Sequence, residues 1–179
     1  VFIAGLARAG TTLLMRRFFA TGTFRSLTYR DMPFVLMPNL WHLLTAYSRK
    51  SGKKHEREHG DGLAVDYDSP EALEEVFWRV FTGRNYIKKD KLIPAAADDE
   101  TIQKFQSYIA ALCAGRIGGN VSRYLSKNNN NILRLSSIRK AFPAACIILV
   151  FREPLQQAIS LHLQHKRFIA RHKEDCFIS

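Results

Sequence analysis

The chain has 179 residues, of which 46% are hydrophobic and 24% are charged, and its formal net charge is +11. This length and composition predict one folded domain with a substantial core and exclude an intrinsically disordered chain. No apolar run reaches the roughly 20 residues that cross a bilayer, and the charge favours an anionic partner such as a nucleotide, an acidic glycan, a nucleic acid or a membrane surface.

The cysteines give no sign of a metal site. Cys113, Cys146 and Cys176 are far apart in the chain, and none belongs to a pair with metal-ligand spacing. A reducing compartment is therefore favoured, and a cytoplasmic location is expected. The chain begins at Val1, in what reads as a strand, so a signal or an anchor encoded upstream stays open.

Strands and helices are predicted to alternate along the chain. Ser69-Pro70-Glu71 is expected to start a helix, because serine caps a helix and proline suits its first position. The expected elements are a strand over 1–4, a helix over 12–18, a strand over 24–29, a turn over 30–33, a helix over 36–47, a polar loop over 49–62 that acts as a lid or acceptor loop, helices over 69–81 and 99–112, a strand over 121–126 ending at Lys127, a helix over 128–142, a buried strand over 146–151 and a helix from Pro154. This alternation predicts an α/β fold with a central parallel sheet in a three-layer α/β/α arrangement.

The segment GLARAGTTLL, residues 5–14, has the glycine spacing of a phosphate-binding loop between a strand and a helix. Backbone N–H groups in such a loop, together with the positive end of the helix, favour an anion. Thr11 stands where a nucleotide triphosphate loop needs its lysine, so the loop is expected to hold a phosphate-like group without a magnesium triphosphate. The alternative is a tight turn without a ligand. The predicted contacts are Arg8, Ala9, Gly10, Thr11 and Thr12.

A second anion-binding pair is predicted at the end of the strand over 146–151. Arg152 follows this strand, and Ser160 lies eight residues later in the next helix. Ligands of open α/β folds bind at the carboxyl ends of the strands, where an arginine and a hydroxyl suit an additional phosphate. The alternative is that Arg152 is an ordinary ion-pair arginine at the helix edge.

These motifs resemble those of the sulfotransferase family. GLARAGTTLL resembles the 5′-phosphosulfate loop, ILVFREPLQQAIS resembles the 3′-phosphate motif, and SKNNNNILRLSSIRKAFPAACIILVFREP is similar to the stretch between them, so the resemblance covers residues 1 to about 168. It implies a fold like that of P-loop nucleoside triphosphate hydrolases and a 3′-phosphoadenosine 5′-phosphosulfate (PAPS) donor. It also implies metal-free sulfuryl transfer to a hydroxyl of a glycan, a lipid or a small molecule. Because domains of this family are usually longer, 1–179 is expected to be one domain truncated at its C-terminus and possibly at its N-terminus.

The resemblance also suggests charge-neutralising residues. Lys127 corresponds to the lysine that family members carry before a short helix, and it is expected to assist Arg8 in neutralising the transferred group. The alternative for Lys127 is a solvated surface lysine.

Two candidates emerge for the general base. Asp31 lies 21 residues after Gly10, and some family members, including the tyrosylprotein type, carry a catalytic carboxylate at a similar distance from the loop. The alternative is a turn residue that pairs with Arg30. His59, with Asp61, is the second candidate, and the alternative for it is a solvated loop histidine.

Two other functions remain as alternatives. A P-loop nucleotide-dependent kinase or phosphotransferase would explain the loop, but it needs a loop lysine and a carboxylate at a strand end. A noncatalytic anion- or nucleic-acid-binding module would explain the charge, but the basic residues are spread along the chain and no nucleic-acid motif is present. The expected partners are therefore PAPS or its product and a hydroxyl acceptor, and no oligomeric state is indicated.

Overall fold

The computed structural model describes residues 1–45, 55–56, 64–114 and 123–174. The strands are β1 (Phe2–Gly5), β2 (Phe24–Arg25), β3 (His55–Glu56), β4 (Ala64–Val65), β5 (Arg123–Tyr124), β6 (Ser126–Lys127) and β7 (Ile147–Val150). The α-helices are α1 (Thr11–Phe19), α2 (Pro38–Leu44), α3 (Glu75–Tyr86), α4 (Asp99–Ala114), α5 (Leu135–Ala141) and α6 (Pro154–Glu174), and the 3-10 helices are η1 (Tyr29–Phe34) and η2 (Asn129–Leu133).

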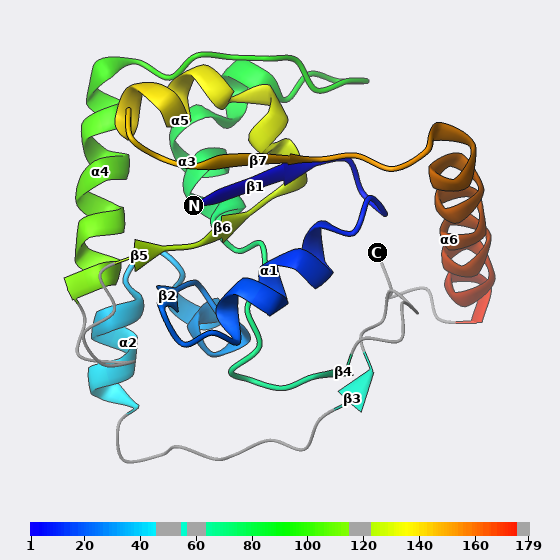
Figure 1. Ribbon diagram of the computed structural model, residues 1–179, viewed down its shortest axis with the longest axis horizontal. Helices are drawn as coiled ribbons and strands as arrows, with labels where there is room; N and C mark the ends of the chain where they lie inside the picture. The colour runs from blue at the N-terminus through cyan, green and yellow to red at the C-terminus, as the bar shows by residue number, and fades with distance from the viewer. Residues whose placement is uncertain (46–54, 57–63, 115–122, 175–179) are drawn as a thin grey trace.

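The centre of the fold is a parallel sheet with the strand order β6-β1-β7. In its register Ile3 pairs with Lys127, and Gly5 pairs with Val150. Figure 1 shows this sheet with α5 on one side and α1 on the other, and α6 beyond the end at which β1 and β7 finish. The predicted α/β fold with a central parallel sheet flanked by helices is confirmed.

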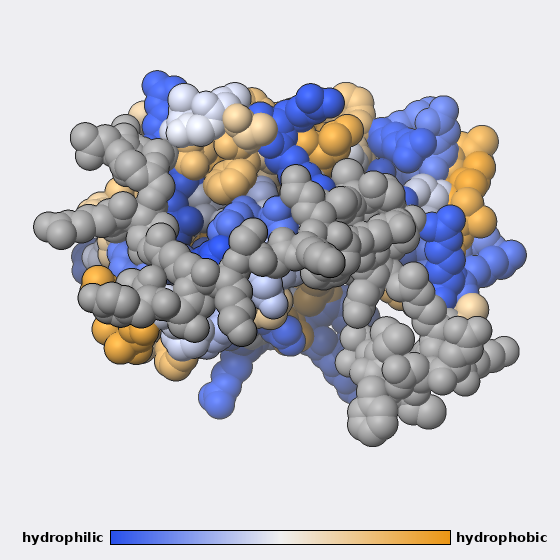
Figure 2. All heavy atoms as spheres, turned by 90° about the horizontal axis from the view of Figure 1, so that it is seen from below, coloured by the Kyte–Doolittle hydropathy of each residue, from blue (hydrophilic) through white to orange (hydrophobic). Residues whose placement is uncertain are grey.

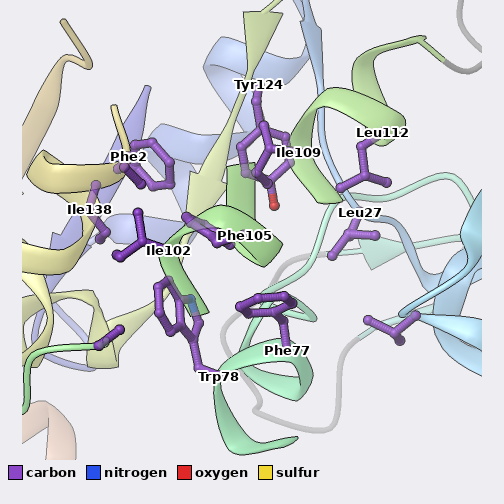
Figure 3. Packing of buried hydrophobic residues seen from close by; sticks show 13 residues of the cluster. Phe2, Leu27, Phe77, Trp78, Ile102, Phe105, Ile109, Leu112, Tyr124 and Ile138 are labelled. Atoms are coloured by element: carbon purple, nitrogen blue, oxygen red, sulfur yellow. The ribbon is translucent and has the colours of Figure 1, made fainter. Parts of the chain in front are cut away.

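Strand β1 divides the core because its successive side chains point to opposite faces. Phe2 packs into a cluster of buried residues from α3, α4 and α5, in which its ring lies against Phe105 (Figure 3). The partly buried Phe142, which packs against this cluster, stacks on Phe2 with ring centroids 5.9 Å apart. Ile3 points the other way and packs against Met15 of α1 and Leu125. This four-residue strand therefore holds the helices of both faces against the sheet.

The predicted helix start at Ser69 is wrong, because α3 begins at Glu75. Ser69 and Pro70 instead run beside the segment that follows β2. The Ser69 hydroxyl binds Asp66, and Pro70 forms an antiparallel bridge with Thr28. The N–H of Glu71 donates to the carbonyl of Leu27, 3.0 Å away. Backbone pairing with this segment thus overrides the local helix signal.

Several other predicted boundaries also change. The strand over 24–29 is confined to β2, and the helix over 36–47 shortens to α2. The turn over 30–33 is part of η1, and β3 lies within the predicted loop over 49–62, most of which is outside the described residues. The single helix over 128–142 divides into η2 and α5, although Asn128 caps its start as predicted by accepting a hydrogen bond from Asn130 N.

The strand over 146–151 is less buried than its sequence predicts. Leu149 is 55% exposed, and Phe151, just beyond β7, is 89% exposed. Within the described residues β7 pairs with β1 on one side alone, and α6 does not cover its face. Hydrophobic side chains also gather at the margin of the molecule over α6 (Figure 2). No helix among the described residues has the length and hydropathy needed to cross a membrane.

Glu74, directly before α3, is buried between β5 and the core. Because a buried carboxyl group titrates differently in the folded and unfolded states, we expect the stability of the protein to depend on pH. Trp78 Nε1 and the Tyr124 hydroxyl donate to its carboxyl group at 2.8 and 2.9 Å. Burial raises the pKa of Glu74 above 4.5, against the opposing effect of hydrogen bonds from Trp78, Ser126 and Tyr124. Between pH 4.5 and the raised pKa, the folded state therefore binds more protons than the unfolded state. The free energy of unfolding contributed by Glu74 falls as the pH rises through this window.

We expect Glu74→Gln to remove this contribution because glutamine stays neutral, keeps one oxygen that accepts from Trp78 Nε1, and has an amide N–H that can donate to the Tyr124 hydroxyl. Urea unfolding of the two proteins from pH 4.5 upward measures the effect, and the variant should gain stability relative to the parent as the pH rises. Glu100→Gln on exposed α4 is the control. Parallel stability curves for the parent and Glu74→Gln would show that Glu74 is ionised in the folded state.

Candidate functional site

The loop between β1 and α1 begins at a glycine that accommodates the neighbouring strand. A Cβ atom at Gly5 would lie 2.3 Å from the backbone carbonyl oxygen of Val150, the residue paired with it in β7. It would also lie 3.1 Å from the methyl group of Thr11. Only a residue without a side chain lets the loop start at this point of the sheet.

Gly5→Ala is accordingly expected to destabilise the protein by about 1–3 kcal/mol, because β7 would have to shift away from β1. Urea unfolding measures this loss. Gly10→Ala is the matched comparison, since no atom lies within 4 Å of a Cβ at Gly10 and only its backbone conformation, with φ of 96°, opposes the change. An equal loss in both variants would contradict the steric argument.

The backbone of the loop adopts left-handed conformations that are typical of anion-binding loops. Arg8 has a φ of 67°, in the left-handed region that a non-glycine residue rarely adopts, and Gly10, with φ of 96°, caps α1. Such conformations at a loop before a helix turn successive N–H groups inward. The first turn of α1 carries no acidic residue, so nothing there opposes an anion. Thr11 is buried, and Thr12 is partly exposed.

The two predicted anion motifs meet. Arg8 Nε donates a hydrogen bond to Ser160 Oγ at 3.0 Å, across 152 residues of sequence. Arg152 lies at the start of this second motif, where its exposed guanidinium contacts Gln156 Oε1 at 3.3 Å. The structure thus joins Arg8 to Ser160, while Arg152 points to a neighbour on its own segment.

Sequence reasoning missed Gln157, which lies inside the second motif. Its side chain is 7% exposed, and its Nε2 donates to the carbonyl oxygen of Ala7 at 2.9 Å. The available signal was its spacing of three residues from Ser160, which places both side chains on one face of α6.

Lys127 is the last residue of β6, as predicted, and is 7% exposed. It pairs with Ile3, two residues before the loop begins, so it lies at the carboxyl edge of the strand next to β1. Lys127 is therefore buried, whereas the alternative that the sequence also allowed was a solvated surface lysine. The backbone that follows is held in place, because Asn128 N donates to the Ile3 carbonyl at 3.2 Å.

Glu75, at the start of α3, anchors the segment after Lys127 and was also missed from the sequence. Its Oε2 accepts from Asn128 Nδ2 at 2.6 Å and from Arg134 Nη2 at 2.9 Å. Its Oε1 accepts from Tyr86 at 2.5 Å and Asn130 at 2.9 Å. An acidic residue in the first turn of a helix is common, and no local signal shows that Glu75 accepts hydrogen bonds from four side chains.

Asp31 is fully buried, with 0% exposure. Its carboxylate accepts from the backbone N–H of Thr28 at 2.7 Å, lies 2.7 Å from His42 Nε2 and forms a salt bridge with Arg25 at 3.4 Å. Arg30, its expected alternative partner, binds Asp68 instead. These contacts favour a structural role at the start of η1, and the general-base role of Asp31 stays a prediction.

The second general-base candidates, His59 and Asp61, lie outside the described residues. Among the described residues, no three His, Cys, Asp or Glu side chains come together as potential metal ligands.

The sequence matches the model of a known protein family. The model of the family described as Sulfotransferase family matches residues 1–173 of the 179-residue chain. No curated protein and no solved structure gives a significant match. The matched residues include the loop, Lys127 and both ends of the second motif, and because they make up most of the chain, the chain belongs to the sulfotransferase family.

Proposed function

We propose that the protein transfers the sulfuryl group of PAPS to a hydroxyl group of a glycan, a lipid or a small molecule. The observation that supports the proposal is the hydrogen bond between Arg8 and Ser160, because it joins the loop that resembles a 5′-phosphosulfate loop to the segment that resembles a 3′-phosphate motif. A donor that carries phosphates at both ends of its ribose needs two adjacent anion sites. The ends of parallel strands, where both motifs begin, are the usual ligand edge of such a sheet.

In this proposal the loop amides and Arg8 stabilise the charge that develops during transfer, with Lys127 assisting from the end of β6. The acceptor oxygen forms a bond to sulfur as the bond between sulfur and the bridging phosphate oxygen breaks. The electron pair of the broken bond leaves with adenosine 3′,5′-bisphosphate. The acceptor proton passes to a general base, for which Asp31 and His59 are the candidates.

Calorimetric titration tests the donor site. We expect adenosine 3′,5′-bisphosphate to bind more tightly than ADP, to bind equally with and without magnesium, and to lose affinity in Arg152→Ala. Binding of ADP that equals or exceeds that of the bisphosphate, or that requires magnesium, would reject the donor assignment and favour a nucleotide kinase.

Transfer of radiolabelled sulfate from PAPS tests the reaction itself. Glycan, lipid and small-molecule acceptors are assayed as three separate pools. The pool that takes up the label identifies the acceptor class. We expect Lys127→Ala to lower kcat while leaving the affinity for the bisphosphate nearly unchanged, since its charge acts on the transferred group. An equal loss of bisphosphate affinity would instead place Lys127 in ground-state binding.

A further inference from the structure

Helix α6 contacts the predicted anion-binding loop between β1 and α1, residues 6–10, through Gln157, a glutamine that has no assigned role. Gln157 is 7% exposed, whereas Leu155 and Ile159 beside it on the same helix are 67% and 51% exposed. Figure 1 shows the loop after β1 reaching toward α6. Gln157 Nε2 donates to the carbonyl oxygen of Ala7 at 2.9 Å, so the buried amide is used to hold the loop backbone.

This carbonyl belongs to the peptide that joins Ala7 to Arg8. Arg8 has a φ of 67°, a conformation that costs an L-residue about 1–2 kcal/mol, so the loop needs contacts that hold it there. Helix α6 supplies two of them. Gln157 holds the backbone immediately before Arg8, and Ser160 accepts from Arg8 Nε at 3.0 Å.

The same contact sets the direction of a backbone N–H group. In a trans peptide the C=O and N–H groups point in opposite directions, so an Ala7 carbonyl held toward α6 turns the Arg8 N–H away from α6. If this peptide flipped, its carbonyl oxygen would take the place of the N–H and would repel an anion in the loop. A side-chain N–H donor at Gln157 therefore favours the orientation that an anion site requires.

We propose that Gln157 is a positioning residue of the donor site, which acts by holding the Ala7–Arg8 peptide and not by touching the donor. The proposal rests on the proposed function, because it takes adenosine 3′,5′-bisphosphate as the ligand of the loop. It assigns a role to Gln157, which lies between Arg152 and Ser160 in the second predicted motif.

Titration of Gln157→Met with adenosine 3′,5′-bisphosphate is the first test, since methionine keeps the length of the side chain and removes its N–H donor. We expect the affinity to fall about tenfold, because without this hydrogen bond the free protein holds the peptide in the binding-competent orientation for a smaller fraction of the time, while the protein still unfolds in one cooperative transition. Gln103→Met, at an exposed position of α4, is the control and should bind like the parent. Unchanged affinity in Gln157→Met would overturn the proposal.

A double-mutant cycle with Arg8→Ala separates the backbone of residue 8 from the Arg8 side chain. Because Gln157 holds the Ala7–Arg8 peptide, which Arg8→Ala keeps, Gln157→Met should weaken binding by a similar factor in both backgrounds. A loss confined to the parent would mean that Gln157 acts only through the guanidinium, and would overturn the proposal.

An NMR measurement keeps the two proposals distinguishable. The coupling between the amide and Hα protons of Arg8 depends on φ, and it can be measured without nucleotide. We expect Gln157→Met to change this coupling toward a conformational average. If the parent binds no bisphosphate, the donor assignment fails, while a changed coupling still supports the positioning of Arg8 and an unchanged coupling rejects it.

Discussion

Replacing Arg8 with alanine is expected to lower sulfuryl transfer by about 100-fold or more, because the loop loses the cation that we propose to stabilise the transferred group. Arg8 is the residue at which the two anion motifs meet, through its 3.0 Å hydrogen bond to Ser160. Transfer of radiolabelled sulfate measures the activity, and calorimetry with adenosine 3′,5′-bisphosphate measures the remaining affinity. Arg8→Lys should recover part of the activity, since it keeps the charge and loses the planar guanidinium.

The matched variant Arg8→Gly separates the charge from the backbone. We expect it to be as inactive as Arg8→Ala but more stable than Arg8→Ala by about 1 kcal/mol, because glycine adopts a φ of 67° without the steric cost of a Cβ. Thermal and urea unfolding compare the two proteins. Activity in Arg8→Gly close to that of the parent would exclude the guanidinium from the reaction, and equal stability of the two variants would show that the left-handed backbone is not a source of strain.

Glu75→Ala is expected to destabilise the protein by about 3 kcal/mol. Its removal leaves Arg134, whose side chain is 5% exposed, buried without its carboxylate. The Arg134 guanidinium lies between the rings of Trp78 and Tyr86, 5.0 and 4.9 Å from their centroids, so it has little freedom to move to water. Urea unfolding measures the loss.

Two control variants separate the charge of Glu75 from its shape. Glu75→Gln keeps the size and one acceptor oxygen, so a smaller loss is expected than in the alanine variant. Glu100→Ala removes a carboxylate that is 76% exposed and pairs with Lys104, and should change stability by no more than about 0.5 kcal/mol. A loss of stability in Glu75→Ala no larger than that in Glu100→Ala would show that the hydrogen bonds and the ion pair of Glu75 contribute nothing to stability.

Local sequence predicts the parts of the site that depend on the backbone near them. A short apolar strand followed by a glycine-rich turn and a helix produced β1, the loop and α1 close to their predicted positions. Lys127 ends β6 as predicted, and α6 begins at Pro154. These features depend on glycine and proline conformations, on capping and on apolar spacing, which act over a few residues.

Predictions failed where partners distant in sequence compete with local preference. Ser69 and Pro70 carry a helix-start signal, yet they lie beside Thr28 and Leu27, because backbone hydrogen bonds hold this segment against the chain that follows β2. The strand that ends at Val150 has a sequence typical of a buried strand, but its burial depends on which elements lie beside it.

The sequence by itself determined the α/β fold and the glycine-rich loop after the first strand, because glycine spacing and apolar periodicity are local properties, and its motifs and the family match determined that it belongs to the sulfotransferase family. Only the tertiary structure decided that Arg8 meets Ser160, that Gln157 holds the Ala7 carbonyl, and that Glu75 anchors the segment after Lys127. Each of these contacts joins residues separated by more than 50 positions. Their geometry follows from how the helices pack on the sheet, which no local pattern encodes.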